Sequence, residues 1–104
     1  MIDTPRAGDP PRPEEAPVPD VVLYSRPACG LCDETRRALQ ALLAERAASG
    51  LPTPRLLERD IDTDPAWQRA YFTSIPVVEL AGRRLELATS AARLRALLHD
   101  VLDA

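Results

Sequence analysis

Lysine is absent from this chain of 104 residues, and all 13 of its basic residues are arginines. Catalysis by a lysine amine is therefore excluded. The formal net charge of -3 argues against a nucleic-acid-binding surface, which needs clustered basic residues. No apolar run approaches the roughly 18 residues of a membrane span, and the N-terminus lacks the basic and hydrophobic regions of a signal peptide. We therefore expect a cytoplasmic protein that binds neither nucleic acid nor membranes.

Cysteine is scarce, and the two cysteines are too few for a small scaffold held by disulfides. A chain of this length builds a core without several disulfides or a structural metal. Its 45% hydrophobic and 28% charged residues are typical of a globular domain. In a compartment that keeps thiols reduced, a close cysteine pair is more often catalytic, redox-sensing or metal-binding than structural.

Large apolar residues are almost missing from residues 1–19, which hold six of the 11 prolines together with charges of both signs. Such a segment buries too little surface to offset the entropy lost on ordering. We therefore predict a disordered proline-rich arm at 1–19 and one folded domain at 20–104. The run Pro-Pro-Arg-Pro in the arm is a weak signal for a partner that recognises proline motifs.

The rest of the chain alternates between short apolar runs and helical patterns. The strand candidates are β-branched or apolar and are bounded by proline, glycine or aspartate, and the helix candidates carry apolar residues at a helical spacing with capping residues before them. The predicted strands lie at 21–24, 55–61, 76–80 and 84–87, and the predicted helices run from 31 to the stop at Gly50, from 65 to about 72, and from a cap at Thr89 or Ser90 to 102.

The predicted element order is β-α-β-α-β-β-α. Two strands joined by a helix imply a parallel pair with a right-handed crossover, and the hairpin turn at 81–83 adds an antiparallel pair. Helices then cover both faces of a small mixed sheet. The sequence therefore predicts an α/β fold with a four-stranded mixed sheet.

Both cysteines lie where the first strand gives way to the first helix, in the segment Pro27-Ala28-Cys29-Gly30-Leu31-Cys32. Residues i and i+3 share one face of a helix, so this pair is close enough for a disulfide. At the helix N-terminus, free N–H groups and the helix dipole favour the thiolate of Cys29, the form that attacks. Cys32 lies deeper and would resolve the mixed disulfide. Pro27 holds the turn, and Gly30 leaves the first turn of the helix uncrowded.

Metal binding is the main competing interpretation of the cysteines. A structural zinc site needs four ligands, and the only other soft ligand is His99 in the last helix, which suits an ordinary helix-end position. Residues 60–64 imitate the start of a calcium loop, but Pro65 replaces the required glycine and Tyr71 the final glutamate. A strand end and a helix cap explain these acidic residues, so no bound metal is expected.

Two further sets of residues allow two interpretations each. Arg26, Arg36 and Arg37 would make the rim of the cysteine site basic and steer an acidic thiol such as glutathione. In the second interpretation, they are solvated arginines balanced by nearby carboxylates such as Asp33 and Glu34. Aromatic residues of the second helix, at 67 and 71–72, would either pack or contact a ligand.

The sequence resembles glutaredoxin-like proteins of the thioredoxin superfamily. Three features over residues 20–102 carry the resemblance: strand 21–24 followed by the cysteine motif at 29–32, the segment Thr-Ser-Ile-Pro-Val-Val at 73–78, and the element order. The sequence Leu-Cys-Asp at 31–33, the segment Asp62 to Pro65, and Tyr71 before Ile75-Pro76 are similar to a small bacterial branch of poorly defined function.

The resemblance implies a thioredoxin-like fold and a cis peptide bond before Pro76. It implies that Cys29 is the nucleophile and Cys32 the resolving cysteine, and that Ile75 offers its backbone to the substrate or to glutathione. Tyr24, Arg26, Pro27, Ile75 and Pro76 are the candidate thiol-binding residues. No bound cofactor is implied, and glutathione is a candidate co-substrate.

The chain departs from glutaredoxins at several positions. Gly30-Leu31 replaces the Pro-Tyr pair between the cysteines, no lysine precedes them, and residues 87–90 stand in place of the double glycine and acidic contact. The reductant therefore stays open between glutathione and a thioredoxin-type reductase.

The leading hypothesis is a monomeric thiol–disulfide oxidoreductase that acts on a disulfide-containing protein or a small thiol. The alternatives are a non-enzymatic binding or adaptor module with a vestigial cysteine pair, and a metal or iron–sulfur carrier that uses Cys29 with an outside thiol.

Overall fold

The computed structural model describes residues 17–103, so the predicted arm lies outside the described residues except for its last three positions. Seven helices and strands follow one another in the predicted order, with a short 3-10 turn added before the second helix. They are β1 (Val21–Ser25), α1 (Gly30–Ala48), β2 (Leu56–Asp60), η2 (Ile61–Thr63), α2 (Pro65–Tyr71), β3 (Val77–Leu80), β4 (Arg83–Leu85) and α3 (Ala91–Leu102). None of the helices in this part of the chain is long and apolar enough to cross a membrane.

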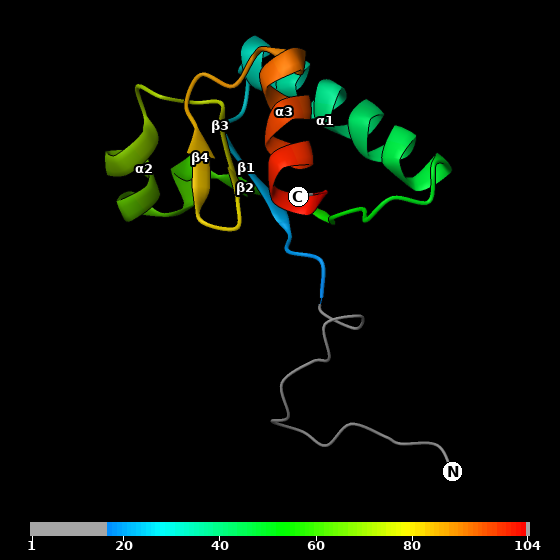
Figure 1. Ribbon diagram of the computed structural model, residues 1–104. Helices are drawn as coiled ribbons and strands as arrows, with labels where there is room; N and C mark the ends of the chain where they lie inside the picture. The colour runs from blue at the N-terminus through cyan, green and yellow to red at the C-terminus, as the bar shows by residue number, and fades with distance from the viewer. Residues whose placement is uncertain (1–16, 104) are drawn as a thin grey trace, which may run out of the picture.

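The four strands form one mixed sheet in the order β2-β1-β3-β4. Strands β1 and β2 are parallel, with Val21 opposite Leu56, as expected for two strands joined by helix α1. Strands β1 and β3 are antiparallel, and so are β3 and β4. The end of β1, the start of β3 and the end of β4 therefore meet at one end of the sheet, at the top of Figure 1.

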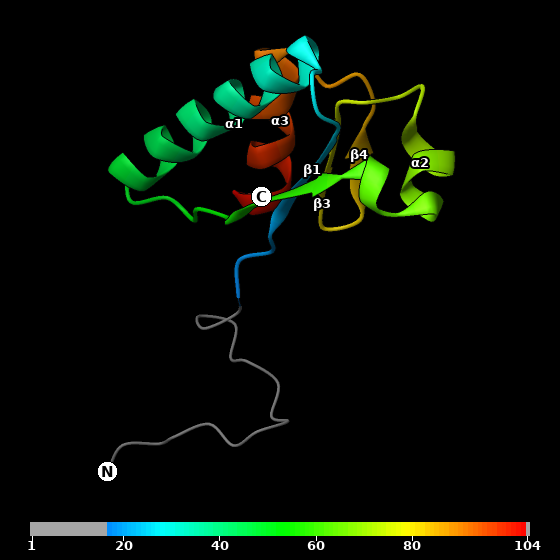
Figure 2. The same ribbon diagram turned by 180° about the vertical axis from the view of Figure 1, so that it is seen from behind.

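Each face of the sheet has its own hydrophobic cluster, because successive strand side chains point to opposite faces. Val21 and Leu23 point to the face covered by α1 and α3, where an aliphatic core of 11 buried residues forms. Tyr24 points to the opposite face and joins a smaller cluster with residues of η2, α2 and β3. Figures 1 and 2 show α1 and α3 on one side of the sheet and α2 on the other.

The helices begin and end where the sequence predicts. Asp64 accepts a hydrogen bond from the N–H of Ala66 at the start of α2, and Ser90 accepts one from Arg93 at the start of α3. Gly50 ends α1 with a positive φ of 71°, a conformation that glycine adopts without strain.

The segment after β4 differs from the prediction. The strand ends at Leu85, and Leu87 adopts a left-handed conformation with φ 47° instead of extending the strand. Its N–H donates to the carbonyl of Ser74, and the N–H of Ala88 donates to the carbonyl of Pro76. The chain therefore turns back toward the loop that precedes β3.

Candidate redox site

Cys29 and Cys32 form a disulfide bond at the start of α1, and their Cα atoms are 5.2 Å apart. Cys29 is the N-cap of the helix, and its sulfur accepts a hydrogen bond of 3.1 Å from the N–H of Cys32. Cys32 is fully buried, whereas Cys29 is partly exposed. Cys29 is therefore the more accessible residue of the pair, and a helix N–H points at its sulfur.

The turn that carries Cys29 has an unusual backbone. Ala28 has a φ of 59°, a conformation that costs a residue with a Cβ atom about 1 kcal/mol. The next residue, Cys29, is the N-cap of α1. Gly30 is not needed to avoid crowding, because a Cβ atom placed there would meet nothing within 4 Å. The surroundings therefore do not require glycine at position 30, although the sequence suggested that glycine keeps the first turn open.

The loop before β3 supplies the second part of the site. The Ile75–Pro76 peptide bond is cis, Pro76 is buried and Ile75 is half-buried. The N–H of Ile75 donates to the carbonyl of Tyr71 at 3.1 Å, at the end of α2. This bond occupies the N–H that the resemblance would offer to a substrate, so the carbonyl is the backbone group of Ile75 that a substrate can use.

The loop after β4 joins these two parts. The hydroxyl of Thr35, one turn beyond Cys32 in α1, donates to the carbonyl of Ala88 at 2.7 Å. Both groups are buried. The N–H of Ala88 donates to the carbonyl of Pro76, and the N–H of Leu87 donates to the carbonyl of Ser74. The loop is therefore held by α1 on one side and by the cis-proline loop on the other.

Two of the three arginines expected at the rim are paired with carboxylates. Arg36 binds Glu58 through two nitrogens and binds Asp33 through a third, and Arg26 lies 3.2 Å from Asp62. For these two arginines the structure therefore favours the balanced arrangement over a basic rim.

A polar cavity of about 160 Å³ opens beside the redox turn. It is lined by Ser25, Arg26, Pro27, Ala28, Asp33, Arg36, Glu58 and Asp60. The Ser25 hydroxyl donates to Glu58 at 3.1 Å. The hydrogen bonds from Arg36 hold the pKa of the Glu58 carboxyl below its usual value, and the Ser25 hydroxyl acts in the same direction.

Tyr24 lies in the hydrophobic cluster on the face of the sheet opposite α1, and Ile75 packs against the same cluster. Its ring packs against Tyr71, with centroids 4.5 Å apart, and against Trp67 at 5.9 Å. Burial raises the pKa of its hydroxyl. Packing therefore accounts for Trp67 and Tyr71, whereas Phe72 is 59% exposed. The role of Tyr24 in thiol binding stays a prediction.

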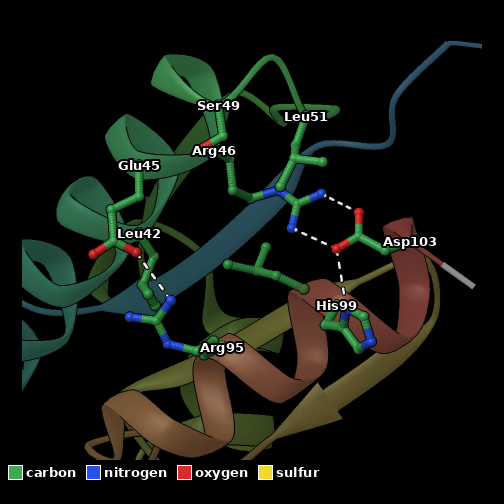
Figure 3. Close-up of a pocket in the computed structure, with 9 residues that line it drawn as sticks. Leu42, Glu45, Arg46, Ser49, Leu51, Arg95, His99 and Asp103 are labelled. Carbon is green, nitrogen blue, oxygen red and sulfur yellow. Dashed lines mark hydrogen bonds and ion pairs between the residues drawn. The ribbon is translucent and has the colours of Figure 1, made fainter.

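A second cavity, larger than the polar one, lies at the opposite end of α1, between α1 and α3, and has a volume of about 300 Å³ (Figure 3). Arg46 crosses it to bind both carboxylate oxygens of Asp103, and His99 contacts Asp103 at 3.1 Å. The hydrogen bonds from Arg46 lower the pKa of Asp103 to about 2. Within residues 17–103, no three His, Cys, Asp or Glu side chains gather as a metal site.

Asp60 and Asp64, two residues of the segment that imitates a calcium loop, act as helix caps. A carboxylate oxygen of Asp60 accepts from the N–H of Asp62 at the start of η2, and Asp64 accepts from Ala66. The strand end and helix cap expected for this segment are both present.

Sequence reasoning missed the residues that link the loops of the site. Thr35 was not singled out within the predicted helix, and Leu87 was placed in the predicted strand 84–87. A threonine on an apolar helix face, one turn after the second cysteine, is the only local signal for the first. Nothing local in the sequence marks the turn at Leu87.

Comparisons with known proteins agree with this geometry. A family model described as "Glutaredoxin-like domain (DUF836)" matches residues 20–100. A solved structural-genomics target protein from X. campestris is 33% identical, with a TM-score of 0.63, and the match covers 78% of this chain and 97% of that one. None of the curated proteins matches the chain.

More distant structures share the fold alone. A protein from Nitrosomonas europaea is 22% identical, with a TM-score of 0.60 over 77% of this chain and 91% of that one. The germline-specific thioredoxin Deadhead from Drosophila melanogaster is 20% identical, with a TM-score of 0.58 and 82% of each chain covered. The predicted thioredoxin-like fold is confirmed.

Proposed function

Because this chain belongs to the glutaredoxin-like domain family, we propose that it is a thiol–disulfide oxidoreductase in which Cys29 attacks and Cys32 resolves. The observation that carries the proposal is the asymmetry of the pair. Cys29 is partly exposed and accepts a helix N–H, whereas Cys32 is fully buried behind it.

In the reduced protein, the Cys29 thiolate attacks one sulfur of a substrate disulfide. The substrate S–S bond breaks, and one substrate sulfur leaves as a thiolate that takes a proton from water. Cys32 then loses its proton and attacks the Cys29 sulfur of the mixed disulfide. The Cys29–Cys32 bond forms and the second substrate thiolate leaves. The substrate gains two electrons and two protons from the protein. A dithiol or two monothiols then reduce the Cys29–Cys32 disulfide by supplying two further electrons and two protons.

The expected setting of this reaction is a compartment that keeps thiols reduced, which favours the cytoplasm. The reductant is either glutathione or a thioredoxin-type reductase, and the substrate is a disulfide-containing protein or a small thiol. A monomer is sufficient for the chemistry, because both reacting sulfurs come from one chain.

A trapping experiment tests the assignment of roles. A Cys32→Ser variant is expected to accumulate mixed disulfides through Cys29, because the resolving step is lost. A Cys29→Ser variant is the matched control and is expected to trap none, because the remaining cysteine is buried. Comparable trapping by the Cys29→Ser variant would mean that the roles are reversed.

A redox titration tests the activity itself. The purified protein is equilibrated with reduced and oxidised glutathione, and the thiol states are read by mass. A Cys29–Cys32 disulfide with a potential of about -200 to -270 mV supports an oxidoreductase. A pair that exchanges only at the rate of an ordinary exposed thiol would favour the binding-module alternative.

A further inference from the structure

Exposed apolar side chains gather at the redox end of the molecule. Five large hydrophobic residues are exposed in the part of the chain that the structure describes: Val18 at 39%, Leu31 at 50%, Leu51 at 45%, Phe72 at 59% and Leu87 at 57%. Val18 precedes β1 and Leu51 precedes β2. Because these two strands are parallel, both residues lie at the other end of the sheet. The remaining three, Leu31, Phe72 and Leu87, lie on segments at the cysteine end, and we call them the apolar rim.

The topology of the sheet brings the three segments of the apolar rim to the same end of the molecule. Leu31 follows the end of β1, Phe72 lies in the connection that leads to β3, and Leu87 follows the end of β4. Because β3 is antiparallel to both β1 and β4, these three strand ends meet at one end of the sheet. Figures 1 and 2 show the loop after β4 passing beside the first turn of α1.

Leu87 is held in place by its backbone while its side chain is left in solvent. Its own N–H bonds to Ser74, and the next residue bonds to both Pro76 and Thr35. Its φ of 47° is unfavourable for leucine, which lacks the short polar side chain that stabilises this conformation in asparagine or aspartate. Neither folding nor packing explains an exposed leucine at this position, whereas contact with a bound molecule does.

The charges around the cysteines do not match an acidic thiol. Arg26 and Arg36 are both engaged by carboxylates, and the polar cavity beside the redox turn holds three acidic residues and two arginines. Glutathione carries two carboxylates and an apolar surface limited to short methylene groups. An uncharged, apolar segment of polypeptide fits both the balanced charges and the exposed side chains of the apolar rim.

We infer that the apolar rim selects polypeptide disulfides whose cysteines are flanked by large apolar residues, and that Leu87 is a specificity-determining residue. This inference rests on the proposed oxidoreductase function. The flanking side chain of the substrate packs on Leu87 and Leu31 while its disulfide meets the sulfur of Cys29. The carbonyl of Ile75 is available to hold the substrate backbone.

The test uses two synthetic peptides, each with one internal disulfide, that are identical except at the residues beside the cysteines. One peptide has leucine at those positions and the other has serine. The reduced full-length protein is mixed with each peptide, and release of peptide thiol is followed over a single turnover. Burial of one leucine side chain predicts that the wild-type protein reduces the leucine peptide roughly tenfold faster.

The Leu87→Asn variant is expected to bring the ratio of the two rates close to one. Asparagine accepts the left-handed backbone, so the loop is expected to keep its conformation. A Phe72→Gln variant, altered on a separate segment, is expected to lower the same ratio. Leu51→Gln is the matched control, because Leu51 is an exposed leucine at the other end of the sheet, and it is expected to keep the wild-type ratio.

The outcomes separate the two proposals. Equal rates for both peptides with the wild-type protein, or a ratio that Leu87→Asn leaves unchanged, overturn the inference and leave the oxidoreductase standing. Faster reduction of glutathione disulfide than of the leucine peptide also overturns the inference. No exchange with any of the three disulfides overturns the oxidoreductase proposal, and the inference with it.

Discussion

Each end of helix α1 is tied to the rest of the molecule by an arginine, and the two arginines differ in burial. Arg36, near the cysteines, is 29% exposed and binds carboxylates that are themselves exposed. Arg46, at the far end, is 9% exposed and binds Asp103, which is 18% exposed. The redox end combines surface ion pairs with the apolar rim, and the far end combines a partly buried ion pair with the larger cavity. The larger of the two cavities therefore does not mark the position of the cysteine pair.

We therefore expect the far end to stabilise the fold, and under the proposed function we expect the redox end to recognise substrate. Arg46 also donates to the carbonyl of Pro52 at 2.7 Å, so it ties α1 to the connection before β2 as well as to α3. Arg36 ties α1 to β2 through Glu58 in a setting that water screens.

The largest expected effect is the loss of Arg46. Arg46→Ala removes a partly buried ion pair, the bond to Pro52 and the packing of a buried side chain, and is expected to lower the free energy of unfolding by about 2–3 kcal/mol. Urea unfolding measures this change. Arg46→Met keeps the apolar stem and separates packing from charge. Disulfide exchange by the folded protein should not change, and a slowed exchange would break the division between the two ends.

The next effect concerns the bond between α1 and the loop after β4. Thr35→Val leaves the buried Ala88 carbonyl without its donor, and is expected to lower the free energy of unfolding by about 1–2 kcal/mol. Thr35→Ser keeps the hydroxyl and is the matched control. Because this loop carries Leu87, the Val variant should also reduce the preference for the leucine peptide. A variant of unchanged stability would mean that the bond contributes nothing.

A smaller effect is expected at the exposed arginine. Arg36→Ala should lower the free energy of unfolding by at most about 1 kcal/mol, because solvent screens its ion pairs. The pKa of Glu58 should rise toward its usual value, since Arg36 is the main cause of its lowering. Titration of the labelled carboxyl by NMR measures the shift. A loss of stability as large as that of Arg46→Ala would remove the contrast between the two ends.

The far end should also respond to acid. The pKa of Asp103 is lowered to about 2 in the folded protein, from 3.8 for a free aspartate side chain. Its contribution to stability is therefore present above the unfolded value and is lost as the pH falls from about 4 to about 2. Unfolding midpoints measured across this window should fall less steeply in Asp103→Asn. An identical slope in the variant would show that other carboxyls control the acid response.

The smallest effect has the opposite sign. Leu87→Asn relieves an unfavourable left-handed leucine, and is expected to raise the free energy of unfolding by up to about 0.5 kcal/mol. Thermal unfolding of the variant beside the wild-type protein measures this gain. A clear loss of stability would mean that the leucine side chain packs on its own protein, and would weaken the case for substrate contact.

Local patterns in the sequence were sufficient for the element order and the cysteine pair. The apolar run at 21–24, the stripe of leucines in α3 and the caps at Asp64 and Ser90 each depend on neighbours a few residues away. The same holds for the position of Cys29 at the helix N-terminus.

The features that the sequence did not reveal depend on contacts between residues far apart in the chain. Leu87 turns because its N–H and that of Ala88 bond to the cis-proline loop, and a local pattern reads the same residues as a continuing strand. The choice between a basic rim and balanced arginines stayed open because Glu58, which binds Arg36 through two nitrogens, is 22 positions away. The pair of Arg46 and Asp103 is 57 positions apart, so no local spacing reveals it.

In the proposed mechanism, the sulfur atom that caps helix α1 is also an atom that reacts. The N–H of Cys32 points at the Cys29 sulfur, so this single amide experiences each chemical state of that sulfur in turn: disulfide, mixed disulfide and thiolate. In isotope-labelled protein its backbone resonance is therefore a built-in reporter of the reaction cycle, with no attached dye. The coupling also runs in reverse, because anything that loosens the first turn of α1 weakens the hydrogen bond that favours the thiolate.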